Sequence, residues 1–112
     1  MSKQWKFTHA QKTLEALLDE ATVDAYGDEE QFTGVVITLD ENLPFPFTAQ
    51  IVGETVEVIG IDENASSLSR GIVARVRRDN KEFRVGLAEL SVPHKIEINK
   101  YWEMYQYWLG GF

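Results

Sequence analysis

The sequence predicts an α+β fold, a small, SH3-like, strongly bent antiparallel β-barrel flanked by an N-terminal and a C-terminal helix. Short segments in the middle of the chain alternate apolar and polar residues, which is typical of half-buried strands. Turn residues separate these segments at close spacing, as in small barrels. Near both ends, apolar residues recur at helical spacing instead. With 112 residues and 44% hydrophobic content, we expect a single domain covering residues 1–112.

The N-terminal helix is predicted over residues 9–21. The apolar residues at helical spacing are Ala10, Leu14, Leu17, Leu18 and Ala21. The opposite face, which we expect to be solvated, holds Lys12, Glu15, Asp19 and Glu20. Thr8 and Gln11 fit a capping box, with Thr8 as the N-cap. Ahead of the helix, Trp5 and Phe7 are apolar enough to dock onto the fold.

Six short strands are expected after this helix, over residues 22–26, 31–39, 47–51, 56–58, 72–77 and 82–87. Asp79-Asn80 between the last two indicates a tight hairpin. The second and third are joined by Asp40-Glu41-Asn42-Leu43-Pro44-Phe45-Pro46-Phe47. Proline lacks an N–H and has a fixed φ, so this connector should be rigid and extended, with Phe45 or Phe47 in the core.

A C-terminal helix is predicted over residues 98–109. Its apolar face is almost entirely aromatic and consists of Ile98, Tyr101, Trp102, Tyr105, Trp108 and Leu109. Gly110-Gly111 should end the helix. We expect this face to pack on its own domain, and the alternative is a partner-binding surface.

Composition excludes several classes of protein. The chain has no cysteine, so disulfides and thiolate metal sites are ruled out. No apolar run approaches the roughly 20 residues of a membrane span, and no signal-peptide pattern is present, so we expect a cytoplasmic protein without a membrane partner. A net charge of −7 argues against nucleic-acid binding.

The charges are unevenly distributed along the chain. Between Lys12 and Arg70 there is no Lys or Arg, while the same interval holds 13 of the 18 acidic residues. Carboxylates without internal counter-ions repel one another and destabilise a compact state. A bound cation would relieve that repulsion, and solvation at the surface is the alternative.

Three expected loops open with nearly the same acidic triplet, 28–30, 40–42 and 62–64. Carboxylates, Asn carbonyls and backbone carbonyls are the oxygen ligands that Ca²⁺ prefers, whereas Mg²⁺ demands a tighter octahedron. The pattern of an EF-hand does not occur. The triplets therefore point to Ca²⁺, and ordinary turn residues are the alternative.

The sequence contains few residue combinations that are typical of a catalytic site, so we do not expect an enzyme. His9 and His94 lie at opposite ends of the chain without metal-ligand spacing. Ser66, Ser67 and Ser69 have no nearby His motif. The basic cluster Arg75, Arg77, Arg78 and Arg84 should share one face of the hairpin and pair with the acidic half of the chain.

Two motifs resemble the CcbP-type calcium-binding family of bacterial proteins. They are Val23-Asp24-Ala25-Tyr26-Gly27-Asp28-Glu29-Glu30-Gln31 and Leu39-Asp40-Glu41-Asn42-Leu43-Pro44-Phe45-Pro46-Phe47, followed at the end by Tyr107-Trp108-Leu109-Gly110. The resemblance implies a small acidic protein that binds Ca²⁺ through carboxylates without catalysis. The resemblance implies that the acidic residues inside these motifs are the candidate ligands, namely Asp24, Asp28, Glu29, Glu30, Asp40 and Glu41. Asp62 and Glu63 join them on composition alone.

We therefore expect a calcium buffer or sensor that binds the ion, with a protein as a candidate second partner. The alternative is a metal-independent interaction module that uses the barrel surface or the aromatic C-terminal helix. If residues 31–39 form a strand, the first two triplets lie at its opposite ends, roughly 30 Å apart at about 3.3 Å per residue. Two separate calcium sites are then expected rather than one.

Overall fold

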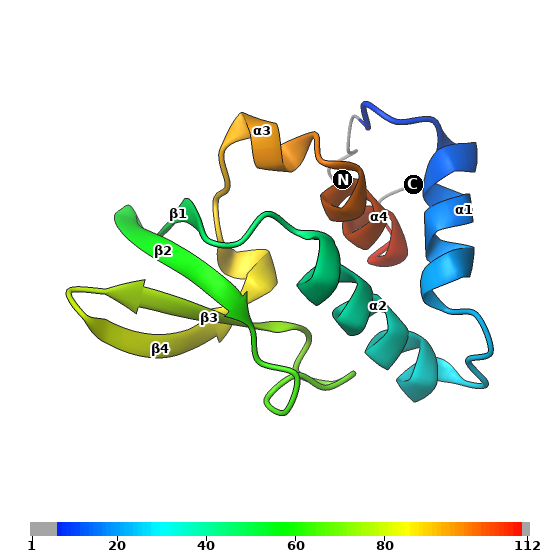
Figure 1. The fold of residues 1–112 in the computed structure, drawn as a ribbon, viewed down its shortest axis with the longest axis horizontal. Helices are drawn as coiled ribbons and strands as arrows, with labels where there is room; N and C mark the ends of the chain where they lie inside the picture. The colour runs from blue at the N-terminus through cyan, green and yellow to red at the C-terminus, as the bar shows by residue number, and fades with distance from the viewer. Residues whose placement is uncertain (1–6, 111–112) are drawn as a thin grey trace.

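Residues 7–110 are described by a computed structural model, in which helices cover one side of an antiparallel sheet (Figure 1). The elements are α1 (Gln11–Ala21), α2 (Asp28–Asn42), β1 (Phe47–Ile51), β2 (Glu54–Ile61), β3 (Val73–Arg78), β4 (Lys81–Gly86), a 3₁₀ turn η1 (Leu87–Glu89), α3 (His94–Glu97) and α4 (Lys100–Trp108). Within the described residues, no helix is long and apolar enough to cross a membrane.

The sheet is open, so the α+β class is confirmed while the predicted barrel is wrong. Its order is β1-β2-β3-β4, with neighbours antiparallel and β1 and β4 as opposite edges. Only four of the six expected strands form, and the helices close one face of the sheet instead. A register shift between Val58 and Gly60 of β2 turns Ile61 into the core beside Ala74.

The predicted strand over 31–39 is wrong, because this segment lies inside the 15-residue helix α2. Its β-branched residues favour a strand. However, its buried residues are Phe32, Val35, Val36 and Leu39. These recur at i, i+3, i+4 and i+7, the spacing that places them on one helical face. The predicted strand over 22–26 is also wrong, since residues 22–27 form the turn between α1 and α2.

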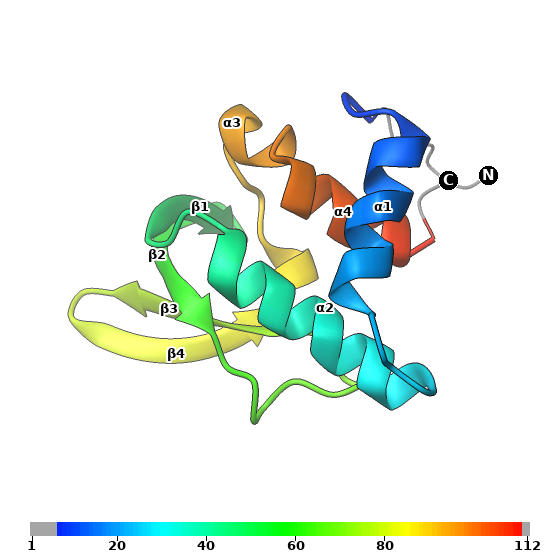
Figure 2. The same ribbon diagram turned by 45° about the vertical axis from the view of Figure 1, so that its right-hand side comes forward.

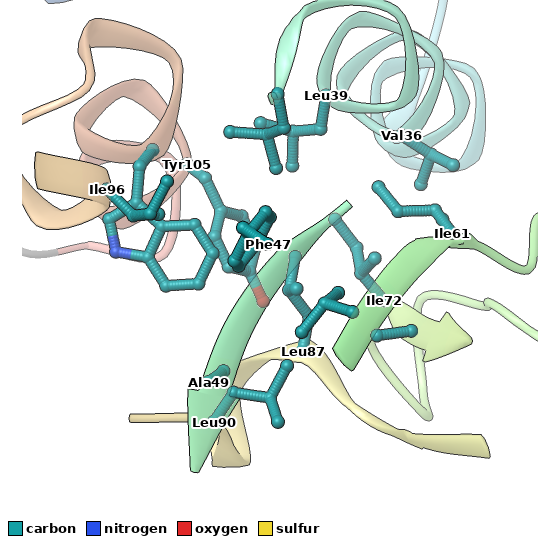
Figure 3. Packing of buried hydrophobic residues seen from close by; sticks show 14 of the residues in the cluster. Val36, Leu39, Phe47, Ala49, Ile61, Ile72, Leu87, Leu90, Ile96 and Tyr105 are labelled. Atoms are coloured by element: carbon teal, nitrogen blue, oxygen red, sulfur yellow. The ribbon is translucent and has the colours of Figure 1, made fainter. Parts of the chain in front are cut away.

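The core lies between the inner face of the sheet, α2 and α4 (Figure 3). Val36 of α2 lies near Ile61 at the end of β2, and Tyr105 of α4 lies beside Phe47. Leu87 and Leu90 close the lower side of the cluster. Burial of this face is what selects helix over strand for α2, because tertiary packing overrides a local propensity.

The proline connector bends instead of staying extended. Leu43 has extended backbone angles, but residues 45–46 form a bend that includes a cis Phe45–Pro46 peptide. The chain must turn here because it passes directly from a helix into an edge strand. The expected burial of Phe47 is confirmed, and Phe45 stacks on it with ring centroids 5.5 Å apart.

The C-terminal aromatic face packs on its own domain, as expected. Trp102 and Tyr105 are buried, and Trp108 contacts Phe32 of α2 with a centroid distance of 5.8 Å. The predicted helix over 98–109 begins two residues later, as α4, because Asn99 caps it by accepting the N–H groups of Tyr101 and Trp102. Gly110 follows with φ of 93°, and Gly111 lies outside the described residues.

The segment before α1 is held by a buried carboxylate and not by a capping box. Glu103 of α4 is 3% exposed and accepts the Thr8 N–H and the His9 N–H, each at 3.0 Å, and also the Thr8 hydroxyl. The N-cap of α1 is Ala10, so the prediction for Thr8 is wrong. Phe7 is half-buried, and Trp5 lies outside the described residues. His9 and His94, expected to be incidental, precede α1 and begin α3 respectively.

The arginine cluster pairs with acidic residues on the outer face of the sheet, as expected. The guanidinium groups of Arg75, Arg77, Arg78 and Arg84 contact Glu82, Glu57, Glu54 and Asp62 respectively. The first three pairs link neighbouring strands, and the fourth links β4 to the turn after β2. Ion pairs near the surface each contribute little to stability, typically under about 1 kcal/mol. None of these four arginines forms an ion pair with an acidic residue of α2.

Candidate metal centre

The first acidic triplet forms the first turn of α2 and does not lie in a loop after a strand. Gly27 is the N-cap, with φ of 114° that a side chain would strain. Three successive carboxylates follow, at Asp28, Glu29 and Glu30. The helix dipole favours negative charge at this end. The Glu30 carboxylate also accepts the N–H of Tyr26 and so fixes the entry into the helix.

Three carboxylates border one hollow. A cavity of about 470 Å³ lies between the end of α1, the turn that follows it and one face of α2. Asp24, Glu29 and Glu30 line this cavity, and the backbone at Asp24 is left-handed, with φ of 60°. Successive helical residues point about 100° apart, so Asp28 faces away from the cavity that Glu29 and Glu30 share.

The hollow depends on Gly34, where the end of α1 comes close to the middle of α2. A side-chain carbon at Gly34 would lie 2.2 Å from the carbonyl oxygen of Ala21. Glycine therefore allows the end of α1 to rest on the middle of α2, while the turn over residues 22–27 stands away from the helix. Figure 2 shows α1 beside α4, with its C-terminal end directed toward α2.

The second triplet occupies the opposite end of the same helix. Asp40 and Glu41 are exposed in the last turn, where no basic residue offsets the negative end of the helix dipole. The Asn42 amide donates to the carbonyl of Thr38. A helix rises 1.5 Å per residue, so Glu29 and Asp40 are about 17 Å apart along α2, instead of the roughly 30 Å expected for a strand.

A second, smaller hollow lies beside this end of α2. Its volume is about 220 Å³, and its polar lining comes from Glu20 of α1 with Thr38 and Asn42 of α2. Sequence patterns placed Glu20 only on a solvated helical face. Its position next to Asn42 depends on how α1 packs on α2, which no local pattern shows.

The third triplet begins with Asp62, which is hydrogen-bonded to β4 of the sheet. Asp62 accepts the Arg84 Nε–H at 2.7 Å and the Ala65 N–H at 3.0 Å. These hydrogen bonds, from Arg84 first and Ala65 second, hold the pKa of the Asp62 carboxyl below its ordinary value. The carboxylate is thus already neutralised by a guanidinium, and Glu63 next to it is exposed.

The oxygen ligands at the two ends of α2 fit a hard cation, although their carboxylates do not converge on one point in this structure. The side chains at the two ends of α2 supply carboxylate oxygens, with amide and backbone carbonyls near them, which are the groups that Ca²⁺ accepts in a flexible geometry. Across residues 7–110, no group of three or more His, Asp or Glu is arranged as a ready metal site. Binding at either end of α2 therefore requires exposed side chains to converge.

Comparison with known proteins shows one family. The model of a family described as calcium binding, the CcbP type, matches residues 15–109. No curated protein matches the chain.

Two solved structures share the fold. The crystal structure of CcbP from Anabaena is similar with a TM-score of 0.72 and 20% identity, covering 93% of this chain and 95% of that one. A second structure, described as a calcium binding protein in the calcium-binding form, has a TM-score of 0.69 and 22% identity over 89% of this chain and 91% of its own. The family match covers most of the chain, so the protein belongs to the CcbP-type calcium-binding family, and its ion is Ca²⁺.

Proposed function

We propose that the protein binds Ca²⁺ at the hollow between α1 and α2, through Asp24, Glu29 and Glu30, and that it acts as a non-catalytic buffer or sensor. One observation carries the assignment. These three carboxylates border the same cavity, and no described ion pair uses any of them. Asp28 adds negative charge beside the cavity.

Electrostatics favours the ion strongly at this position. Neither Lys nor Arg occurs between residues 13 and 69, so the repulsion among these carboxylates has no internal counter-charge nearby in sequence. A divalent cation would remove that repulsion while the turn adjusts. Mg²⁺ gains less, because it keeps its waters and tolerates little departure from an octahedron.

A second, separate site is proposed at the other end of α2. Asp40 and Glu41 would supply carboxylates, and Asn42 and Glu20, which line the neighbouring hollow, would have to turn toward them to add oxygen ligands. A cation there would also offset the negative end of the helix dipole. Asp62 and Glu63 remain weaker candidates, because an ion would have to displace Arg84 from Asp62.

Calorimetric titration with Ca²⁺, with Mg²⁺ as competitor, tests both sites. Asp24→Asn/Glu29→Gln should lose one binding event and keep the other, and Asp40→Asn/Glu41→Gln should do the reverse. Asp79→Asn/Glu97→Gln is the matched control, because it removes the same charge from positions away from α2. Loss of all binding in both site variants would refute separate sites, and unchanged binding in both would remove these residues from the ligand set.

A further inference from the structure

The hollow between α1 and α2 also presents apolar side chains to solvent. Val23 and Ile37 line it and are 69% and 40% exposed, and Tyr26, next to it in the turn, is 83% exposed. Among the described residues, the large hydrophobic side chains left exposed are Val23, Tyr26, Ile37, Val52, Leu68, Phe83, Ile98 and Leu109. Three of these eight gather at one place. Scattered exposed residues need no explanation, whereas grouped ones mark interaction sites.

These residues form a surface that the fold itself does not use. The core face of α2 is already occupied, and Ile37 lies on the other side of the helix, one turn beyond Thr33. Thr33 and Gly34 are small, so the middle of the cavity stays open. An apolar side chain entering it would contact Val23 from one side and Ile37 from the other.

The rim of the same cavity is negatively charged. Asp24, Glu29 and Glu30 line the cavity together with the apolar side chains, and Arg75, Arg77, Arg78 and Arg84 pair with acidic residues of the sheet and of the adjoining turns instead. A surface of one sign with a low-dielectric floor attracts a partner of the opposite sign and repels an acidic one. The charge thus selects a cationic partner, and the floor selects one with an apolar anchor.

We propose that this hollow docks a cationic amphipathic peptide segment of a partner protein. One or two large apolar side chains enter the cavity against Val23 and Ile37, and flanking Lys or Arg side chains pair with Asp24, Glu29 and Glu30. The volume of about 470 Å³ lies within the range of roughly 300–1,000 Å³ that is usual for ligand pockets. The peptide's apolar residues supply the affinity, and its charges supply the selection against other partners.

The proposal rests on the proposed function in one respect, the effect of Ca²⁺. An ion held by Asp24, Glu29 and Glu30 neutralises the rim that the peptide's cations need. Calcium should therefore weaken peptide binding, and by linkage the peptide should weaken calcium binding by the same factor. The site then acts as a switch that releases a basic partner when calcium rises.

Fluorescence anisotropy with a defined probe tests the docking. The probe is a labelled peptide with Leu at i, i+3, i+4 and i+7 and Lys at the other positions, added to the metal-free protein. Ile37→Ser should weaken its binding about tenfold, the effect of losing roughly 1.4 kcal/mol at an anchor. Leu68→Ser is the matched control, because Leu68 is 44% exposed but lies away from the cavity, and it should leave binding unchanged.

The outcomes separate the docking site from the calcium site. Ile37 offers no oxygen ligand, so Ile37→Ser should bind Ca²⁺ as the parent does. Three outcomes would overturn the docking site. The first is equal peptide binding by Ile37→Ser and Leu68→Ser, and the second is no binding by the parent. The third is equally tight binding of a probe that has Ser in place of Leu. Tight, Ile37-dependent binding that Ca²⁺ does not weaken would overturn the switch. Absence of calcium binding with normal docking would refute the proposed calcium site and with it the switch, but it would leave the docking site intact.

Discussion

Gly34→Ala tests whether the contact between α1 and α2 builds the hollow. In an ordinary helix interior, Gly to Ala stabilises by roughly 1 kcal/mol. Here the added carbon would lie 2.2 Å from the Ala21 carbonyl oxygen and 3.2 Å from its carbon, and both atoms belong to the backbone. Side-chain carbons essentially never lie closer than 3.0 Å, so the helices must separate by at least 0.8 Å.

The expected result is a net loss of stability. Overpacking of this kind typically costs about 1–3 kcal/mol, and a backbone contact cannot be relieved by a rotamer change. Because the contact is with backbone atoms, the cost should lie in the upper part of this range, about 2–3 kcal/mol. After the gain of roughly 1 kcal/mol in helix propensity, we expect a net destabilisation of about 1–2 kcal/mol, or a melting temperature lower by roughly 4–16 °C. Urea unfolding followed by circular dichroism measures it through the midpoint.

Thr33→Ala provides the control for helix propensity. Thr33 is exposed on α2 beside Gly34, so its replacement raises helix propensity without the contact to Ala21 and should not destabilise the protein. A Gly34→Ala protein as stable as the parent would show that α1 and α2 do not meet here. The geometry assigned to the hollow would then be wrong.

Three further predictions concern the core and its titration. Phe47→Ala should cost about 3–5 kcal/mol in urea unfolding and Phe45→Ala less, since Phe47 is 7% exposed and Phe45 only partly buried; equal costs would contradict the packing. Burial raises the pKa of Glu103, but hydrogen bonds from the segment before α1 outweigh burial and lower that pKa below its ordinary value of 4.5. The Glu103 carboxylate therefore stabilises the fold fully above pH 4.5, and this stabilisation is lost as the pH falls further. Glu103→Gln should therefore have a lower melting temperature than the parent at pH 7, and the difference between the two melting temperatures should decrease below pH 4.5. A difference that does not change with pH would show that the charge is not involved. Burial raises the pKa of Tyr105 from 10.0 to about 12, so its contribution is complete below pH 10 and is lost as pH rises toward 12. That loss amounts to roughly 2–3 kcal/mol, and Tyr105→Phe should flatten the decline of melting temperature in this window.

Local patterns were sufficient for the parts of the fold that local residues decide. The spacing of Leu14, Leu17 and Leu18 predicts α1, and alternation predicts the four strands and the Asp79-Asn80 hairpin. α1 and the strands β1, β2 and β3 bury residues on a face that their own periodicity displays, whereas no residue of β4 is fully buried. The acidic stretch without Lys or Arg and the two family motifs likewise indicate calcium binding from the residues alone.

The segment over 31–39 shows where local patterns failed. Val35, Val36 and Ile37 favour a strand, and the helical spacing of Phe32 with Leu39 competes with that preference. Burial against the sheet and α4 decides between them, and only the tertiary structure contains that interaction. The two wrong strands, 22–26 and 31–39, also made the barrel wrong, because a sheet with four strands and helices on one face does not close.

The sequence by itself determined which residues can bind an ion, and the tertiary structure decided which of them lie together. Asp24, Glu29 and Glu30 are close in the chain, yet they share a cavity only because α1 rests on Gly34. Asp62 looked equivalent to them, but Arg84, 22 residues away, neutralises it. Glu20 looked like a solvated residue and lies beside Asn42. Proximity of this kind depends on contacts between distant segments, and charge and spacing along one segment do not encode them.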